Sequence, residues 1–288
     1  MSSWLFVNTC GKRGKLGTKR DFRDRVVVIT GAAGGIGRAM SRRFAKAGAR
    51  LALTDLDGQG VKALCEELVS EGKDCIGFEL DVTDEAACQR VTETVAKRFG
   101  RLDVLINNAG ITHRSAFART ASEVYLRVMD VNYFGSLYCT KACLDYLIEK
   151  KGLIIVISSI AGFSPLLGRT GYSASKHALH GLFDSLRAEL REKGVGVTIV
   201  CPGFTATNIY KSALDGDGGL TSHPQSTVGV PAAPESVAEA VFRAAVRGKQ
   251  LKVLSFVGRL TRILNKFFPG FYERKMARTL RSELEGRD

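Results

Sequence analysis

A tyrosine and a lysine one helical turn apart are the side chains in this sequence best suited to chemistry. Tyr172 and Lys176 lie in the run Gly171-Tyr-Ser-Ala-Ser-Lys176. On a helix, residues at this spacing share a face, so the ammonium would lie beside the phenol. Its field favours the phenolate, and we expect it to lower the pKa of Tyr172 from the usual value of about 10. Such a pair could exchange a proton with an alcohol or carbonyl oxygen.

A glycine-rich run supplies the other half of that chemistry. Thr30-Gly-Ala-Ala-Gly-Gly-Ile-Gly37 follows an apolar, strand-like stretch and opens a helical pattern. Glycine permits a tight turn and a close approach of the backbone to a dinucleotide pyrophosphate. The residues expected at this cofactor are Gly31, Gly35, Ile36 and Gly37. An acid/base beside a nicotinamide would interconvert alcohols and carbonyls.

The acidic residue after the second strand pattern indicates which dinucleotide binds. Asp55 ends the stretch 51–55 and lies 20 residues after Gly35. A carboxylate there can accept from both adenosine ribose hydroxyls and would repel a 2′-phosphate, so NAD is favoured over NADP. An ordinary helix-capping aspartate is the alternative. Arg38 could meet a phosphate, but it lies in the first helical turn and does not change this expectation.

The elements that must position these residues alternate between strand and helix patterns. Strands are expected at 26–30, 51–55, 75–79, 103–106, 153–157, 197–201 and 252–256. Helices are expected near 36–47, 59–71, 84–99, 121–149, 172–192 and 235–247. This rhythm predicts an α/β fold with a doubly wound parallel sheet covered by helices on both faces. The irregular stretch 204–234 is expected to be a functional lid.

Charge is concentrated at the two ends of the chain. The net charge of the 288 residues is +13, of which residues 1–25 carry +5 and residues 242–288 carry +8. A nucleic-acid-binding domain would usually carry a basic stripe within its fold, so we expect no nucleic-acid ligand. The basic ends suit an anionic membrane surface or an acidic partner.

The cysteines indicate whether a metal site is expected, and the apolar runs indicate where in the cell the protein is expected. The seven cysteines and four histidines form no CxxC pair or cluster, so no metal site is expected. Cys139 and Cys143 are interpreted as small buried hydrophobes. Scattered thiols suit a reducing cytosol. No apolar run approaches the roughly 20 residues that span a bilayer, and Trp4-Leu-Phe-Val7 is shorter than the about 7–15 residues of a signal-peptide core. A cytoplasmic location is expected, with peripheral membrane contact as a further option.

Seven motifs in order give the chain a family resemblance. Besides the glycine-rich run, they are Asp81-Val82, Asn107-Asn-Ala-Gly110, Asn132, Ser158-Ser-Ile-Ala-Gly162, Tyr172-Ser-Ala-Ser-Lys176 and Pro202-Gly203. From about residue 24 to 257 the chain therefore resembles the short-chain dehydrogenase/reductase family. The resemblance implies a Rossmann-type sheet of about seven strands, hydride transfer to or from a nicotinamide, and a homodimer or homotetramer. It divides the chain into a flexible basic tail (1–23), a catalytic domain (24–257) and a basic helical extension (258–288).

The resemblance also implies a catalytic tetrad of Asn132, Ser159, Tyr172 and Lys176. Ser159 is preferred to Ser158 because it precedes Tyr172 by 13 residues, the family spacing. Ser159 would hydrogen-bond the substrate oxygen, and Tyr172 would give or take the proton. Lys176 would bind the nicotinamide ribose, and Asn132 would hold a water that links the lysine to solvent.

Further cofactor contacts follow from the same resemblance. Asp81 and Val82 would flank the adenine ring. Pro202 and Gly203 would back the nicotinamide, and Thr207 would hold its carboxamide. The residues expected to shape the strand end beside the cofactor are Asn107, Asn108, Ala109 and Gly110.

The substrate pocket is expected between the strand ends and the loop 204–234. Its candidate lining residues are His113, Leu166, Leu167, Phe204, Ile209 and Tyr210. They suit an apolar carbonyl or secondary alcohol such as a steroid, a retinoid or a fatty aldehyde. His177 and His180 are interpreted as packing or surface residues. A 3-oxoacyl-[acyl-carrier-protein] reductase is the alternative enzyme, although such reductases usually prefer NADP. A catalytically silent scaffold is the non-enzymatic alternative.

The C-terminal segment 251–281 departs from a minimal member of that family. Its apolar residues recur at helical spacing from Phe256 to Phe268, with Arg259, Arg262 and Lys266 between them, and Pro269-Gly270 then interrupts the pattern. A basic amphipathic helix can cover the pocket, form a subunit interface or lie on a membrane. The sequence leaves these three roles open.

Overall fold

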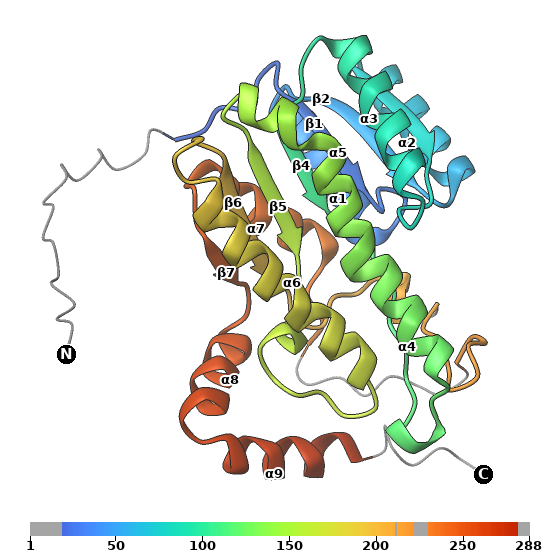
Figure 1. Ribbon diagram of the computed structural model, residues 1–288, viewed down its shortest axis with the longest axis vertical. Coiled ribbons are helices and arrows are strands. Elements are labelled where there is room, and N and C mark those ends of the chain that lie inside the picture. The colour runs from blue at the N-terminus through green and yellow to red at the C-terminus, as the bar shows by residue number, and fades with distance from the viewer. Residues whose placement is uncertain (1–18, 211, 222–229, 282–288) are drawn as a thin grey trace, which may run out of the picture.

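A single sheet lies between two layers of helices in the computed structural model, which describes residues 19–210, 212–221 and 230–281 (Figure 1). Its seven strands are all parallel, in the order β3-β2-β1-β4-β5-β6-β7. The strands are β1 Val26–Thr30, β2 Arg50–Asp55, β3 Cys75–Glu79, β4 Val104–Asn107, β5 Leu153–Ile157, β6 Gly196–Cys201 and β7 Leu251–Val253. The helices are α1 Gly35–Lys46, α2 Gly58–Ser70, α3 Glu85–Phe99, α4 Ser122–Met129, α5 Gly135–Glu149, α6 Thr170–Glu189, α7 Pro234–Val246, α8 Phe256–Phe267 and α9 Pro269–Leu280. The predicted fold class is confirmed.

Each face of the sheet is covered by its own set of helices. Helices α1, α2 and α7 pack on one face, and α3, α5 and α6 pack on the other. Strand β1 shows the consequence, because Val27 and Ile29 belong to the first core and Val26 and Val28 to the second. Side chains alternate across a strand, so a strand covered on both faces must be apolar throughout. This accounts for the continuous apolar runs in the sequence.

Two expected elements differ in detail. The expected helix 121–149 is interrupted by a π-helical turn, Asp130–Phe134, which separates α4 from α5. The expected strand 252–256 ends at Val253, because Ser255 caps a new helix by accepting a 2.9 Å hydrogen bond from the Gly258 amide. Apolar character alone does not separate a short strand from the first turn of a helix.

The folded body begins earlier than residue 24. Phe22 is buried against Phe44 and Phe242, with ring centroids 5.1 and 5.3 Å away. Residues 1–18 of the expected basic tail lie outside the described residues. The expected tail thus contains Phe22, an aromatic residue of the core. The basic residues around it made the whole stretch look like a flexible tail.

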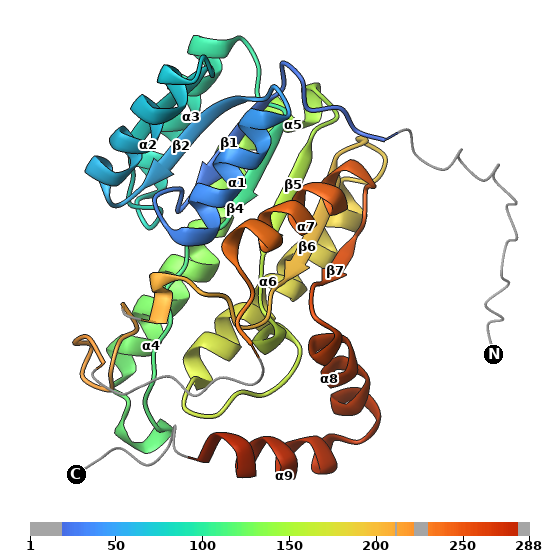
Figure 2. The same ribbon diagram turned by 180° about the vertical axis from the view of Figure 1, so that it is seen from behind.

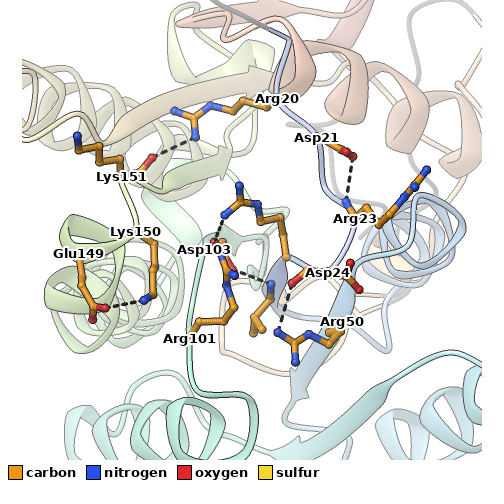
Figure 3. A network of polar contacts seen from close by, with 12 residues as sticks. Arg20, Asp21, Arg23, Asp24, Arg50, Arg101, Asp103, Glu149, Lys150 and Lys151 are labelled. Carbon is orange, nitrogen blue, oxygen red and sulfur yellow. Dashed lines mark hydrogen bonds and ion pairs between the residues drawn. The ribbon is translucent and has the colours of Figure 1, made fainter.

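A charge network closes the amino ends of the central strands (Figure 3). Buried Asp103 accepts hydrogen bonds from Arg25 Nη1 and the Val26 amide, each 3.0 Å long, and from Arg101 at 2.6 and 2.7 Å. Its backbone oxygen accepts from the Leu153 amide at 2.9 Å. One aspartate therefore joins the starts of β1, β4 and β5.

Candidate active site

A cavity of about 1550 Å³ opens at the carboxyl ends of the strands. The chain order reverses between β1 and β4, and open parallel sheets bind ligands at such a switch point. The expected cofactor residues that line the cavity are Gly31, Gly35, Ile36, Gly37, Asp55, Asp81, Val82, Asn108, Ala109, Gly110, Pro202, Gly203 and Thr207. Ser159, Tyr172 and Lys176 line it as well. Motifs far apart in the sequence thus meet at one edge of the sheet.

The glycine-rich turn places the start of α1 against this cavity. Gly31 has φ +65°, and a Cβ there would lie 2.8 Å from the Ala109 backbone. A Cβ at Gly37 would lie only 2.0 Å from the Gly31 oxygen. Among the described residues, no side chain caps the amino end of α1, and its first turn carries no acidic residue. The first amide groups of α1 are therefore suited to an anion such as pyrophosphate.

Asp55 lies at the end of β2, beside the same turn. Its Oδ2 accepts a 2.9 Å hydrogen bond from the Ala33 amide, and its Oδ1 accepts from the Asp57 amide at 3.1 Å. Helix α2 is capped by Asp57 instead, which accepts from the Gly60 amide. The carboxylate of Asp55 thus orders the turn and faces the cavity.

Arg38 is directed to an ion pair on the helical surface. Arg38 and Arg42 of α1 pair with Glu67 of α2, at 3.7 and 2.7 Å. Arg38 is absent from the cavity lining. Its charge is thus balanced by Glu67, on α2.

The ends of β1 and β4 are held together by one threonine and one asparagine. Thr30 Oγ1 accepts from the Asn108 and Ala109 amides, each at 3.0 Å. The Asn108 side chain donates to the oxygens of Thr30 and Gly31, at 3.0 and 2.9 Å. These bonds fix the shape of the cavity floor where the two strands part.

The expected acid/base group lies beside Ser159 at the start of α6. The Ser159 side chain is near enough to the Tyr172 hydroxyl to lower its pKa. Ser159 Oγ also accepts from the Ala161 amide at 3.1 Å. The neighbouring Ser158 is buried and lies 3.1 Å from His180 Nε2 instead. Of the two serines, it is Ser159 that contacts the tyrosine.

The expected lowering of the Tyr172 pKa by Lys176 is wrong for this structure. Burial raises the pKa of Tyr172, outweighing the hydrogen bond with Ser159 and the nearby Arg169, which lower it. Lys176 Nζ lies 5.7 Å from the tyrosine ring centre and donates to the Ile157 oxygen at 3.1 Å. Burial also lowers the pKa of Lys176 itself, to about 8. Spacing placed the two groups together, but desolvation dominates their charges.

Asn132 is fully buried in the π-helical turn between α4 and α5. Its Oδ1 accepts from the Ile111 amide at 2.8 Å, and its Nδ2 donates to the Ile111 oxygen and to Ser175 Oγ at 3.0 and 2.8 Å. It is absent from the cavity lining. The side chain therefore ties the segment after β4 to α6, the helix that carries Tyr172 and Lys176.

The expected substrate residues separate into two groups. Leu166, Phe204 and Ile209 line the cavity. Tyr210 and Leu167 are absent from its lining. His113 is also absent: it is fully buried, and its Nε2 accepts a 2.9 Å hydrogen bond from the Gly171 amide. Burial and Arg169 lower the pKa of His113 to about 4, so it is neutral at pH 7 and supports the start of α6.

The C-terminal helices form the far wall of the cavity. Helices α8 and α9 lie beyond the carboxyl ends of the strands (Figures 1 and 2). Asn265 Nδ2 fastens α8 to the body by donating to the Phe163 oxygen at 2.9 Å. The lining residues from this segment are Leu254, Ser255, Val257, Leu260, Thr261, Leu264, Phe271, Tyr272, Lys275, Met276, Thr279 and Leu280. Most of this wall is apolar.

Arg169 is a cavity residue that the sequence analysis missed. It is 7% exposed, lines the cavity and acts on the charge states of both Tyr172 and His113. A cation three residues before the tyrosine was the available signal, and Arg169 is the residue that immediately precedes α6.

The described ranges hold neither a candidate metal cluster nor a membrane-spanning helix. Within them, no group of three or more His, Cys, Asp or Glu residues could hold a metal ion. Among the helices described, none is long and apolar enough to cross a membrane. Cys139 and Cys143 are buried, as expected for small hydrophobes. His180 packs between Ser158 and Phe163, also as expected.

Comparisons with known proteins agree with this geometry. The short chain dehydrogenase family model matches residues 25–217. The chain is 37% identical over 270 residues to dehydrogenase/reductase SDR family member 7B of Bos taurus, covering 91% of this chain and 83% of that protein. It is 36% identical over 203 residues to family member 7 of Homo sapiens, covering 68% of this chain and 60% of that one.

A solved structure shows the same fold. A short chain dehydrogenase/reductase from Burkholderia phymatum, in complex with NAD, superposes with a TM-score of 0.78 at 23% identity. The match covers 93% of this chain and 98% of that one. With the family match over most of the cavity-forming body, the chain belongs to the short-chain dehydrogenase/reductase family and is an oxidoreductase.

Proposed function

We propose that this protein interconverts an apolar secondary alcohol and its carbonyl, with NAD as the cofactor. The observation that carries the proposal is the junction of Ser159, Tyr172 and Lys176 with the glycine-rich turn in one cavity. The cofactor supplies hydride donation or acceptance when it is bound. The protein supplies binding, orientation, proton exchange and exclusion of water.

The residues fit a dinucleotide in three ways. The open amino end of α1 suits the pyrophosphate, and the carboxylate of Asp55 suits the adenosine ribose hydroxyls. The Thr207 methyl lies so close to Gly35 that a Cβ there would meet it at 2.8 Å, so the loop after β6 covers the turn. Asp55 would repel a 2′-phosphate, and Arg38 is paired with Glu67, so NAD is favoured over NADP. The similar Burkholderia phymatum enzyme was solved with NAD.

Four residues then divide the work at the reacting oxygen. Ser159 orients the substrate oxygen, and Tyr172 gives that oxygen a proton or takes one from it. Because burial raises the pKa of Tyr172, the neutral phenol is its resting form, which suits proton donation to a carbonyl. Lys176 would bind the nicotinamide ribose. Asn132 positions α6 through Ser175 and Ile111, and its place in a water-linked relay remains part of the proposal.

The proposed substrate is apolar because the wall facing the tetrad is apolar. Leu166, Phe204 and Ile209 line the cavity, and Leu260 and Leu264 of α8 line it as well. A long or polycyclic hydrocarbon body would bury its surface against these residues at roughly 25 cal/mol per Å². A steroid, a retinoid and a fatty aldehyde all have this chemistry.

A cofactor and substrate screen tests the proposal. Apolar secondary alcohols and carbonyls of graded size are assayed with NAD and NADP, following the reduced nicotinamide by absorbance. Tyr172→Phe should lower turnover by roughly 10²–10⁴-fold with NAD affinity nearly intact, since the hydroxyl that carries the proton is lost. Tyr146→Phe, a half-buried tyrosine of α5 that is absent from the cavity lining, is the matched control. Turnover above about a tenth of the wild-type rate in Tyr172→Phe would refute the assignment.

We also propose that the outer side of the α8–α9 pair rests on an anionic membrane surface. Phe256, Phe267, Phe268 and Phe271 are 72, 64, 61 and 51% exposed. Burying such a ring is worth roughly 1.5–3 kcal/mol, and exposed clusters of this kind usually mark a binding surface. Exposed Arg259, Arg262 and Lys266 lie among them, which suits acidic lipid headgroups.

The same helix pair forms the rim of the cavity. Val257, Leu260 and Phe271 line the cavity, yet are 48, 44 and 51% exposed. A residue that is both lining and exposed lies at a mouth. A membrane at this rim would let an apolar substrate pass from lipid to the tetrad without crossing water.

Flotation with liposomes tests the membrane contact. The wild-type protein should float with anionic vesicles, and added salt should release it. The double variant Phe267→Ser/Phe268→Ser should lose most of this binding and keep its NAD affinity. Phe117→Ser removes a ring that is slightly more exposed (72%) from another part of the surface, and this variant should float like the wild type. Equal flotation of all three proteins, or of none, contradicts the proposal.

The proposed assembly is a homodimer or a homotetramer. Exposed Leu126 on α4 and Phe134 in the π-helical turn leave apolar surface at some distance from α8. Light scattering measures the assembly directly. The double variant above should keep the oligomer size, whereas a smaller oligomer would make α8 a subunit interface instead of a membrane contact.

A further inference from the structure

Two cysteines at the outer edge of the sheet have their sulfur atoms unusually close together. Cys65 on α2 and Cys75, the first residue of β3, have Sγ atoms 2.9 Å apart. Another neighbouring pair, Cys88 and Cys139, lies 3.6 Å apart. A disulfide needs an S–S distance of about 2.05 Å, so the first pair requires only a small approach.

The local sequence explains why the two thiols meet. Helix α2 ends at Ser70, the chain reverses, and β3 starts at Cys75, so α2 packs directly on the strand. Gly77 makes the close packing possible, because a Cβ there would lie 2.9 Å from Cys65 Sγ and 2.5 Å from a Val61 methyl. The pair is therefore fixed by helix-on-strand packing and does not depend on a long loop.

The two thiols differ in how readily each one loses its proton. A hydrogen bond from Cys75 lowers the pKa of Cys65, and the same bond raises the pKa of Cys75. Cys65 is thus the better thiolate, and Cys75 is the proton donor beside it. Both residues are 8% exposed, and Cys75 lies on the edge strand β3, whereas Cys88 on α3 is 1% exposed.

We propose that Cys65 and Cys75 form a reversible oxidation site that reacts with hydroperoxides. The Cys65 thiolate attacks the peroxide, an S–O bond forms, the O–O bond breaks and an alcohol leaves, giving a sulfenic acid. Cys75 then attacks the Cys65 sulfur, and water leaves as the S–S bond forms. In total, two thiols lose two electrons and two protons, and the hydroperoxide becomes an alcohol and water. The bond fastens α2 to β3, beside the strand that ends at Asp55.

Peptide mapping of the full chain tests this site without using turnover. Trypsin cuts after Lys62, Lys73 and Arg90, so the peptide 74–90 would contain both Cys75 and Cys88. The Cys88→Ser variant removes that ambiguity and serves as the reference protein. After brief treatment with tert-butyl hydroperoxide and alkylation, it should yield peptides 63–73 and 74–90 linked, about 2 Da below the sum of the free peptides. Dithiothreitol should restore both thiols.

Matched variants decide the outcome. In the Cys88→Ser background, Cys65→Ser and Cys75→Ser should each abolish the link. In the otherwise wild-type chain, the Cys65–Cys75 link should form at least about tenfold faster than a Cys88–Cys139 link. Cys88 and Cys139 are less accessible, and their sulfur atoms are further apart. A Cys88–Cys139 link that forms as fast overturns the proposal. So does oxidation that stops at Cys65 sulfinic acid without a link to Cys75. Rates of alkylation by iodoacetamide give a second readout, with Cys65 expected to react before Cys75.

Discussion

The two ends of the same parallel sheet treat charge in opposite ways. At the amino ends of the strands, buried Asp103 receives hydrogen bonds from Arg25, Arg101 and a backbone amide (Figure 3). At the carboxyl ends, Lys176 is 5% exposed and donates a 3.1 Å hydrogen bond to the Ile157 oxygen. The amino end of the sheet pairs its buried charge. The carboxyl end holds a buried amine whose pKa is lowered by burial to about 8.

The contrast shows where the fold is stabilised and where it is prepared for chemistry. A buried carboxylate with several donors stabilises the folded state, because those donors replace lost hydration. A buried lysine with few partners destabilises it until a ligand supplies interactions. The site therefore carries a stability cost that the opposite end of the sheet can offset. Variants at the two ends should separate these roles.

Asp103→Ala should produce the largest change in stability. It removes one partner from a buried network, and we expect the free energy of unfolding to fall by about 3 kcal/mol with turnover nearly unchanged. Lys141→Ala breaks an ion pair with Glu85 in which both side chains are more than half exposed and screened by solvent, so it should leave stability nearly unchanged. Urea unfolding and steady-state kinetics measure the two effects. A large loss of turnover in a folded Asp103→Ala protein would remove the distinction between the ends.

The stability difference between the wild type and Asp103→Ala should depend on pH in a definite direction. Burial alone would raise the pKa of Asp103, but hydrogen bonds from Arg101, Val26 and Arg25 outweigh it and hold the pKa below its usual value. The stabilisation is therefore present above the unfolded pKa of about 4 and is lost as pH falls through the folded value. The stability gap between the wild type and Asp103→Ala should shrink from pH 7 toward pH 2. A constant gap would mean that packing, and not charge, holds the strands.

Lys176 should give a smaller effect in the opposite pH range. Its folded pKa of about 8 lies below the ordinary value of 10.5, so between these values the unfolded chain binds more protons. Stability should thus rise with pH in this window, by about 2 kcal/mol relative to Lys176→Met, which has no amine to titrate. Unfolding of both proteins without cofactor, at pH 7.5 and pH 10, measures the difference. Parallel curves would show that the amine is hydrated in solution.

The sequence predicted the frame of the site better than its energetics. Strand β5 was predicted to the residue, because a strand covered on both faces is a continuous apolar run. The glycine-rich turn was predictable because glycine alone fits its geometry. The raised pKa of Tyr172 was not, since it depends on burial by segments far away in the sequence. The same holds for His113, whose interior position follows from the packing of α6, and for the α8–α9 wall, whose apolar spacing fitted three different roles.

The smallest effect that we expect concerns the cofactor and lies beside Asp55. Leu56 is 68% exposed and lines the cavity. Leu56→Arg adds a cation near the adenosine ribose and leaves the bond between Asp55 and the Ala33 amide in place. The ratio of kcat/KM for NADP to that for NAD should rise about tenfold, equivalent to about 1.4 kcal/mol. Leu126→Arg, at an exposed leucine of α4 (62%), controls for the added charge and should leave the ratio unchanged. An unmodified enzyme that already prefers NADP would contradict the role given to Asp55, while the tetrad and the stabilised amino end of the sheet would stand.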